Sequence, residues 1–243
     1  IRPKLIASTA TTRASTRQIR DLYAREQVAV FPPPGLNADD SFFATYDRFL
    51  EGPHKGRVKP GRMYLGILAR GFGSGLTVNV RVFSALLAAA SLLPKGERDP
   101  WYTLLVFHNA LRELGAGLTL FGADIPERLA ELRSRWTPRG KRRYLNHVLE
   151  LTGRLENNEI PEALKALERR FPQDSRVVDA CLASNIIEVG VDVPRLAMMA
   201  VSGQPKNTAQ YIQATGRVGR EMPGLVAMAY DHRKARDLPH FEH

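Results

Sequence analysis

The chain has 243 residues, enough for one large domain or two small ones with a substantial core. Its formal net charge of +10 favours a polyanionic partner such as nucleic acid, although a basic protein without such a partner could have the same balance. The single cysteine, Cys181, excludes an internal disulfide framework, and no His, Cys, Asp or Glu grouping has metal-ligand spacing. No apolar run reaches the ~18 residues of a membrane span, and no signal peptide is visible. We therefore expect a cytoplasmic protein without a membrane partner, and the start at Ile1 indicates a piece of a longer chain.

The first 60 residues read differently from the rest of the chain. Residues 1–11 are apolar and then hydroxylated, as in a strand that runs into a loop, and residues 12–25 have helical spacing. Three consecutive prolines in residues 31–36 indicate a linker or an exposed arm. Residues 51–62 are polar, basic and rich in glycine and proline, which is typical of a loop. We place an organisational boundary there, with one part at residues 1–60 and the other at residues 61–243.

From residue 61 onward, short apolar runs alternate with helical patterns. This alternation predicts an α/β fold with a mostly parallel sheet that has helices on both faces. The predicted strands are residues 63–68, 102–107, 144–152, 177–184, 196–203 and 224–230. The predicted helices are residues 79–93, one or two within 109–136, 161–171 and 208–220.

The stretch QATGRVGR contains the first candidate site. On one predicted helix, Gln213, Arg217 and Arg220 share a face, and arginine holds phosphate through paired N–H groups. Gly216 and Gly219 would let another surface come close to the helix. A solvated helix with ordinary surface arginines is the alternative interpretation.

A second candidate site lies in residues 181–205. Ser184 and Asn185 follow a predicted strand, where open α/β sheets bind ligands, and their side chains could hold a nucleic-acid phosphate. Asp192 could accept a hydrogen bond from a ribose hydroxyl or from an arginine of QATGRVGR. Basic clusters at residues 139–143 and 233–236, with Arg62, could line a groove for nucleic acid or form a solvated surface.

Four motifs, in this order, resemble those of superfamily 2 helicases. STAT at residues 8–11 resembles motif III, and YTLLVFHN resembles motif IV. ASNIIEVGVDVP and QATGRVGR resemble motifs V and VI. The flanks FPPPGLNADDSFFA and GQPKNTAQYIQATGRVGRE are similar to the DrmA-type helicases of the DISARM phage-defence system. The resemblance implies a RecA-like, P-loop-NTPase-like fold, with residues 1–60 ending a preceding RecA-like domain and residues 61–243 forming the second one.

The resemblance also implies roles for individual residues. Arg220, as arginine finger, Arg217 and Gln213 would be catalytic residues at the triphosphate of ATP. The residues that would bind the nucleotide are Gly190, Asp192 and Gly216. The residues that would contact nucleic acid are Ser184, Asn185, His108 and Asn109. Thr9 and Thr11 would lie at the interdomain junction. We expect DNA in preference to RNA as the strand, with other subunits of a defence complex as partners, although the residues themselves do not decide these points.

Half of an ATPase site is missing from the sequence. It has no G-x-x-x-x-G-K-[ST] loop and no acidic segment of the D-E-x-H kind, so ATP and Mg²⁺ would be bound mainly by the N-terminal RecA-like domain of the same protein. The expected function is the C-terminal motor domain of an ATP-dependent helicase or translocase that is inactive alone. Two alternatives are a non-catalytic RecA-like module that binds nucleic acid or protein, and a regulatory domain that binds nucleotide by itself.

Overall fold

The computed structural model describes residues 3–8, 14–31, 61–135, 141–156, 158–184 and 192–242. The chain divides into two compact units, Ile1–Lys59 and Pro60–His243. In the first unit, helix α1 (Ser15–Tyr23) confirms the helical spacing predicted there. Residues 3–8 form no strand, so that prediction is wrong for the part described. Apolar residues alone do not make a strand, because its backbone groups need a partner strand.

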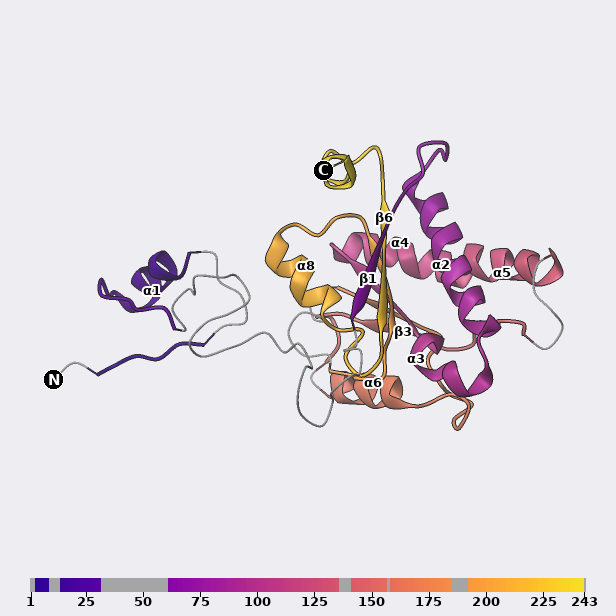
Figure 1. Cartoon of the computed structure of the whole chain (residues 1–243), viewed down its shortest axis with the longest axis horizontal. Helices are drawn as coiled ribbons and strands as arrows, with labels where there is room; N and C mark the ends of the chain where they lie inside the picture. The colour runs from indigo at the N-terminus through magenta and orange to yellow at the C-terminus, as the bar shows by residue number, and fades with distance from the viewer. Residues whose placement is uncertain are drawn as a thin grey trace, which may run out of the picture. The chain divides into compact units, whose positions relative to one another are not determined.

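The second unit is built around a six-stranded parallel sheet, which confirms the predicted α/β class (Figure 1). The strand order is β1-β6-β5-β2-β4-β3. Burial on both faces explains why strands such as β2, which is buried at every position, read as continuous apolar runs. The strands are β1 (Arg62–Leu68), β2 (Leu104–His108), β3 (Val148–Leu151), β4 (Ala180–Ala183), β5 (Met198–Ser202) and β6 (Gly224–Tyr230).

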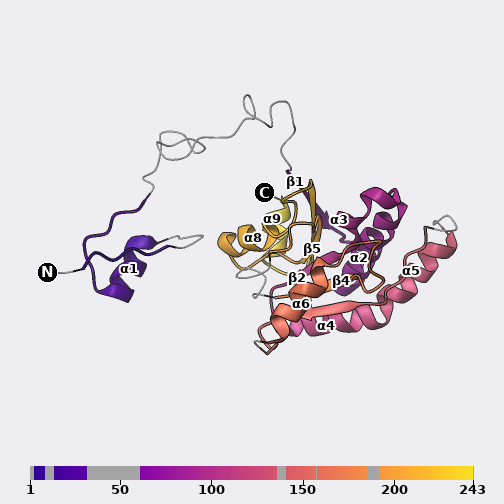
Figure 2. The same cartoon turned by 90° about the horizontal axis from the view of Figure 1, so that it is seen from below.

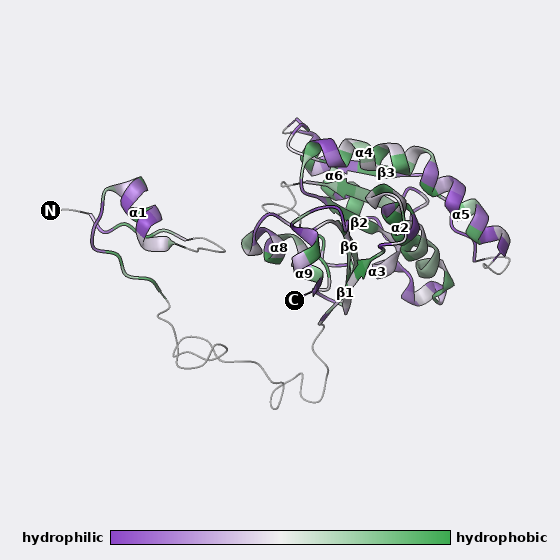
Figure 3. Cartoon of the chain, turned by 90° about the horizontal axis from the view of Figure 1, so that it is seen from above, coloured by the Kyte–Doolittle hydropathy of each residue, from purple (hydrophilic) through white to green (hydrophobic). Residues whose placement is uncertain are grey.

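Helices cover both faces of this sheet (Figure 2). Helices α6 (Glu159–Glu168) and α8 (Thr208–Thr215) pack on one face. Helices α2 (Gly75–Leu92), α4 (Leu111–Gly122) and α5 (Asp124–Arg135) pack on the other. Figure 3 shows apolar residues gathered in the strands and α2, and polar residues along the outer helix α5. The short elements are η1 (Lys95–Glu97), α3 (Asp99–Tyr102) and α9 (Asp237–Glu242).

Helix α2 corrects the expectation that no apolar segment reaches the length of a membrane span. It has 18 residues with a mean hydropathy of 1.5, and among the described helices it alone has that length and composition. The helix is apolar because it packs against one face of the sheet. Phe83 and Leu87 are fully buried among side chains of the strands and of α5. Asn79 on the same helix donates a hydrogen bond to Ser202 at the end of β5, at 2.9 Å.

Because all six strands are parallel, the sheet has two chemically different edges. We call the edge where the strands begin the amino edge and the edge where they end the carboxyl edge. A five-residue strand such as β2 separates them by roughly 17 Å at about 3.3 Å per residue. The candidate residues fall into two groups, one at each edge.

Candidate functional site

The two candidate arginines lie on a turn after helix α8 and not on the helix itself. The side chain of Asn207 caps the start of α8, and the helix ends at Thr215. The prediction of one helix through residue 220 is therefore wrong, and so is the shared helical face. Glycine is a poor helix former and favours helix ends, and two glycines follow Thr215 within four residues. We call residues 216–220 the arginine turn.

The arginine turn is anchored at the amino edge of the sheet. Arg62, the first residue of β1, donates to two carbonyl oxygens of the turn, at 2.6 and 3.3 Å. Gly219 has a φ of 70° and donates its N–H to the carbonyl oxygen of Leu196 at 2.9 Å. A Cβ at position 219 would lie 2.9 Å from the Cα of Gly224, the first residue of β6. Glycine is needed at 219 because the chain's own strand approaches it and because its φ is positive.

Arg220 projects from this turn with 33% of its side chain exposed. Its Nη1 forms an ion pair with Asp192, which confirms the interpretation that Asp192 accepts from an arginine of QATGRVGR. Its Nε donates to the carbonyl oxygen of Gly216 at 3.3 Å. A guanidinium carries five N–H donors, and within the described part of the chain Nη2 of Arg220 has no partner. Among the described residues, the guanidinium is thus held through Nε and Nη1 only.

The other predicted catalytic residues come from the end of α8 and from the arginine turn. Gln213, on α8, and Arg217, in the arginine turn, are both half-buried and both interact with the protein. Neither Arg217 nor Arg220 is part of the hydrophobic core, whereas Val218 between them is fully buried. The roles of Gln213, Arg217 and Gly216 in binding or hydrolysing nucleotide stay predictions.

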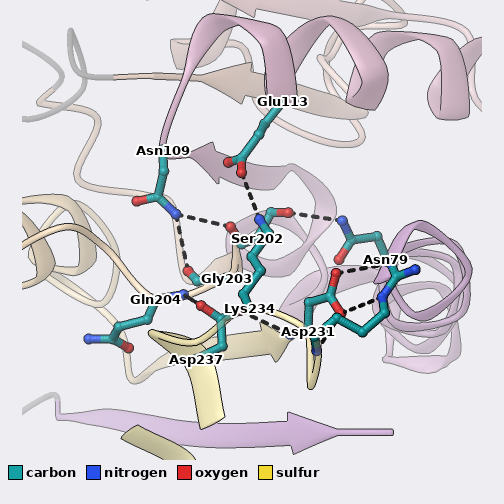
Figure 4. Close-up of polar contacts among 10 residues, drawn as sticks. Asn79, Asn109, Glu113, Ser202, Gly203, Gln204, Asp231, Lys234 and Asp237 are labelled. Atoms are coloured by element: carbon teal, nitrogen blue, oxygen red, sulfur yellow. Dashed lines mark hydrogen bonds and ion pairs between the residues drawn. The ribbon is translucent and has the colours of Figure 1, made fainter. Parts of the chain in front are cut away.

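Three of the residues predicted to hold nucleic acid lie at the carboxyl edge. His108 ends β2, Asn109 follows it, and Ser184 follows β4; they are 1%, 3% and 5% exposed. The side-chain amide of Asn109 donates to the carbonyl oxygens of Ser202 and Gly203, at 3.1 and 3.4 Å (Figure 4). Asn109 therefore holds the loop after β5. Contact of these residues with nucleic acid stays a prediction.

Four more predicted site residues fall outside the described residues: Thr9, Thr11, Asn185 and Gly190.

A pocket of about 260 Å³ opens at the carboxyl edge, beside the first turns of α2 and α4. This is the position at which open parallel sheets bind ligands. The walls come from four strand or helix ends that are far apart in the sequence. The polar side chains that line it include Asn79, His108, Glu113, Ser202, Asp231 and Lys234.

Ion pairs hold the charged wall of this pocket (Figure 4). Lys234 Nζ lies 2.6 Å from Oε1 of Glu113. Arg233 donates to both carboxylate oxygens of Asp231, at 3.1 and 3.2 Å, and this contact lowers the pKa of Asp231. Fully buried Asp237 accepts the N–H of Asp231 at 2.9 Å. The basic cluster at 233–236 is thus partly structural, because two of its cations pair with acidic residues of this domain.

Several buried polar atoms beside the pocket lack partners within the described chain. They are both ring nitrogens of His108, Oδ1 of Asn109 and Oε2 of Glu113. Burial lowers the pKa of His108 to about 4, so its ring is neutral at neutral pH. Native structures leave few such atoms unpaired. A group of them beside one pocket is consistent with a ligand there that carries hydrogen-bonding groups.

Comparison with known proteins identifies the family of this chain. Residues 131–222 match the helicase conserved C-terminal domain family, a range that contains Ser184, Asp192 and the whole arginine turn. The chain is also 37% identical, over 247 aligned positions, to the DISARM protein DrmA of Bacillus paralicheniformis. The chain carries the C-terminal RecA-like domain of a superfamily 2 helicase. The resemblance seen in the motifs is thereby confirmed. This helicase domain covers 21% of the length of that DrmA.

Solved structures share the fold of this helicase domain. A variant of S. cerevisiae Dbp5 bound to RNA and ADP BeF3 is 14% identical, with a TM-score of 0.51; the match covers 96% of this chain and 47% of that one. Mycobacterium smegmatis helicase Lhr, bound to ssDNA and AMP-PNP, is 15% identical, with a TM-score of 0.50; the match covers 72% and 20%. At such low identity these likenesses support the RecA-like fold and nothing finer.

Superfamily 2 helicases depend on ATP, and guanidinium groups such as those of Arg217 and Arg220 are of the kind that pairs with phosphate oxygens. Contact of the arginine turn with ATP stays a prediction. Within the described ranges, no group of three or more His, Cys, Asp or Glu side chains could hold a metal ion.

The sequence analysis did not single out the pocket residues Asn79 and Glu113, and it considered Lys234 only as part of the basic cluster 233–236. Single polar residues in the first turns of helices, such as Asn79 on α2 and Glu113 on α4, are too common to indicate a site. The position of Ser202 at a strand end was the available clue.

Proposed function

We propose that this helicase domain supplies Arg220 as an arginine finger to ATP that is bound, with Mg²⁺, on the N-terminal RecA-like domain of the same protein. The observation that carries the proposal is Nη2 of Arg220, which has no partner among the described residues and lies on an anchored turn. A guanidinium fixed in this way stabilises negative charge on the transferring phosphoryl group. Arg217 and Gln213 assist at the phosphates, and Gly216, Gly190 and Asp192 contact the nucleotide. The domain alone does not hydrolyse ATP.

The contact between Arg220 and Asp192 suits a finger that must change partners. The Asp192 side chain is 64% exposed, and such surface ion pairs contribute about 0–1 kcal/mol. Asp192 therefore orients the guanidinium at little cost to its transfer. A triphosphate carries more negative charge than one carboxylate and offers paired oxygens to the same N–H groups. Binding of ATP would draw Arg220 away from Asp192 while Arg62 and β6 keep the turn in place.

We further propose that a nucleic-acid strand, DNA in preference to RNA, lies along the carboxyl edge near Ser184, Asn185, His108 and Asn109. Helix α8 begins close to that edge and ends at the arginine turn, so it links the two surfaces mechanically. The similarity to DrmA supports a cytoplasmic role in phage defence with other subunits of a defence complex.

The test is ATP hydrolysis by the full-length protein with single-stranded DNA or RNA. Arg220→Ala should lower turnover by roughly 10³- to 10⁵-fold, the effect of an arginine finger in related phosphoryl-transfer enzymes, while strand binding changes little. Arg135→Ala is the matched control, because Arg135 is also exposed and pairs with Glu131 at 3.1 Å, on α5. Unchanged turnover in Arg220→Ala would replace this proposal with the non-catalytic module.

A further inference from the structure

We propose that the pocket at the carboxyl edge receives one amino-bearing pyrimidine base, cytosine, from the bound nucleic-acid strand. The proposal rests on the proposed function, because the strand must lie along this edge. It adds base preference to a domain for which backbone contacts alone were expected.

The pocket is shaped around two of its polar side chains. A Cβ at Gly75 would lie 2.5 Å from Oδ2 of Asp231, and a Cβ at Gly117 would lie 2.7 Å from Nε2 of His108. Any larger residue at either glycine would displace the side chain that it faces. Gly75 is the first residue of α2, and Gly117 lies within α4. Each helix therefore leaves space for a side chain of the pocket.

The unpaired atoms favour a neutral ligand with hydrogen-bond donors. Oε1 of Glu113 is paired with Lys234, and Oε2 of the same carboxyl group offers a hydrogen-bond acceptor. The neutral ring of His108 offers one donor and one acceptor. A phosphate would face the carboxylates of Glu113 and Asp231, whose cationic partners are already engaged. The exocyclic amine of cytosine supplies the donor that Glu113 lacks, a pairing known from base recognition.

The size of the pocket also favours a single base. Its volume of about 260 Å³ lies just below the ~300–1,000 Å³ of pockets for drug-sized ligands. Leu76, Ala116 and Ala229 supply apolar wall against which a flat ring can pack. Arg112 is exposed at the rim, and within the described chain it has no ion-pair partner, which leaves it available to the phosphate next to the inserted base.

The experiment measures binding of the full-length protein to labelled single strands by fluorescence anisotropy. The strands are oligo-deoxycytidine, oligo-deoxyuridine, which differs at the 4-position of the ring, and an abasic strand of equal length. We expect the wild type to bind oligo-deoxycytidine about 5- to 100-fold more tightly than oligo-deoxyuridine, as one good base contact allows. Glu113→Gln should abolish this preference, because its amide can donate to uracil, whereas Glu127→Gln, on the exposed start of α5, should keep it.

Each contrary result is distinct. Equal binding of all three strands by the wild type would overturn the base pocket, and the arginine finger would stand if Arg220→Ala still stopped hydrolysis. Binding of free deoxycytidine without a strand preference would assign the pocket to a nucleoside and overturn the proposal as well. Failure to bind any strand would refute both this inference and the proposed function. The wild-type comparison holds even where Glu113→Gln does not fold.

Discussion

Helix α4 contains two glycines, Gly115 and Gly117, that should respond in opposite ways to the same substitution. A Cβ at position 115 would meet no atom within 4 Å. Gly115→Ala should therefore stabilise the protein by up to about 1 kcal/mol, the difference in helix propensity. A Cβ at position 117 would lie 2.7 Å from Nε2 of His108 and 3.1 Å from Cδ2 of Leu182. Both neighbours are buried, so neither can move into solvent.

Overpacking of this kind costs about 1–3 kcal/mol. Set against the same gain in propensity, Gly117→Ala should lower the free energy of unfolding by about 0–2 kcal/mol. The two variants should thus differ by about 1–3 kcal/mol, or several degrees in melting temperature. Urea unfolding followed by circular dichroism measures the difference, provided that the m-value is unchanged. If Gly117→Ala proved as stabilising as Gly115→Ala, the ring of His108 would be free to move, and a pocket built around a fixed His108 would be refuted.

Three further predictions concern buried groups. The pKa of His108 is about 4 in the folded protein and 6.5 in a free side chain. As the pH falls, the unfolded state therefore binds a proton before the folded state does. The free energy of unfolding should drop by about 3 kcal/mol between pH 6.5 and 4. In urea titrations at several pH values, His108→Gln should lose this part of the slope, and an identical slope would contradict the burial argument. Gly219→Ala should cost about 2–4 kcal/mol in thermal unfolding, from its positive φ and its approach to Gly224; a neutral result would mean that the arginine turn is not anchored. Asp179→Asn should cost about 3–5 kcal/mol, because it leaves Arg143, 2.9 Å from Asp179 and also buried, without its counter-charge; a loss below 1 kcal/mol in urea unfolding would show that Arg143 finds another partner.

The arginines show where sequence reasoning succeeded and where it could not. The motif that contains Arg217 and Arg220 was recognisable because it is contiguous, and its phosphate chemistry depends on residue type. The structural role of Arg62 was hidden, because its partner Val218 lies 156 positions away. Likewise Arg143, in a basic cluster, pairs with buried Asp179 and is not available to a polyanion in that state.

The sequence by itself determined the α/β class. Strands buried on both faces must be apolar throughout, and in the helices between them apolar residues must recur every three to four positions. It also determined which residue types could meet a phosphate. Only the tertiary structure decided how the turn after α8 is held, because Gly219 lies against Gly224 of β6 and donates its N–H to the carbonyl oxygen of Leu196. The arginine turn lies at the amino edge because it precedes β6 in a parallel sheet. Only the strand order, which no local pattern encodes, brought Glu113 and Lys234 together at the carboxyl edge. Pairing between strands that are distant in the sequence brings such residues together, and local sequence patterns do not specify which strands pair.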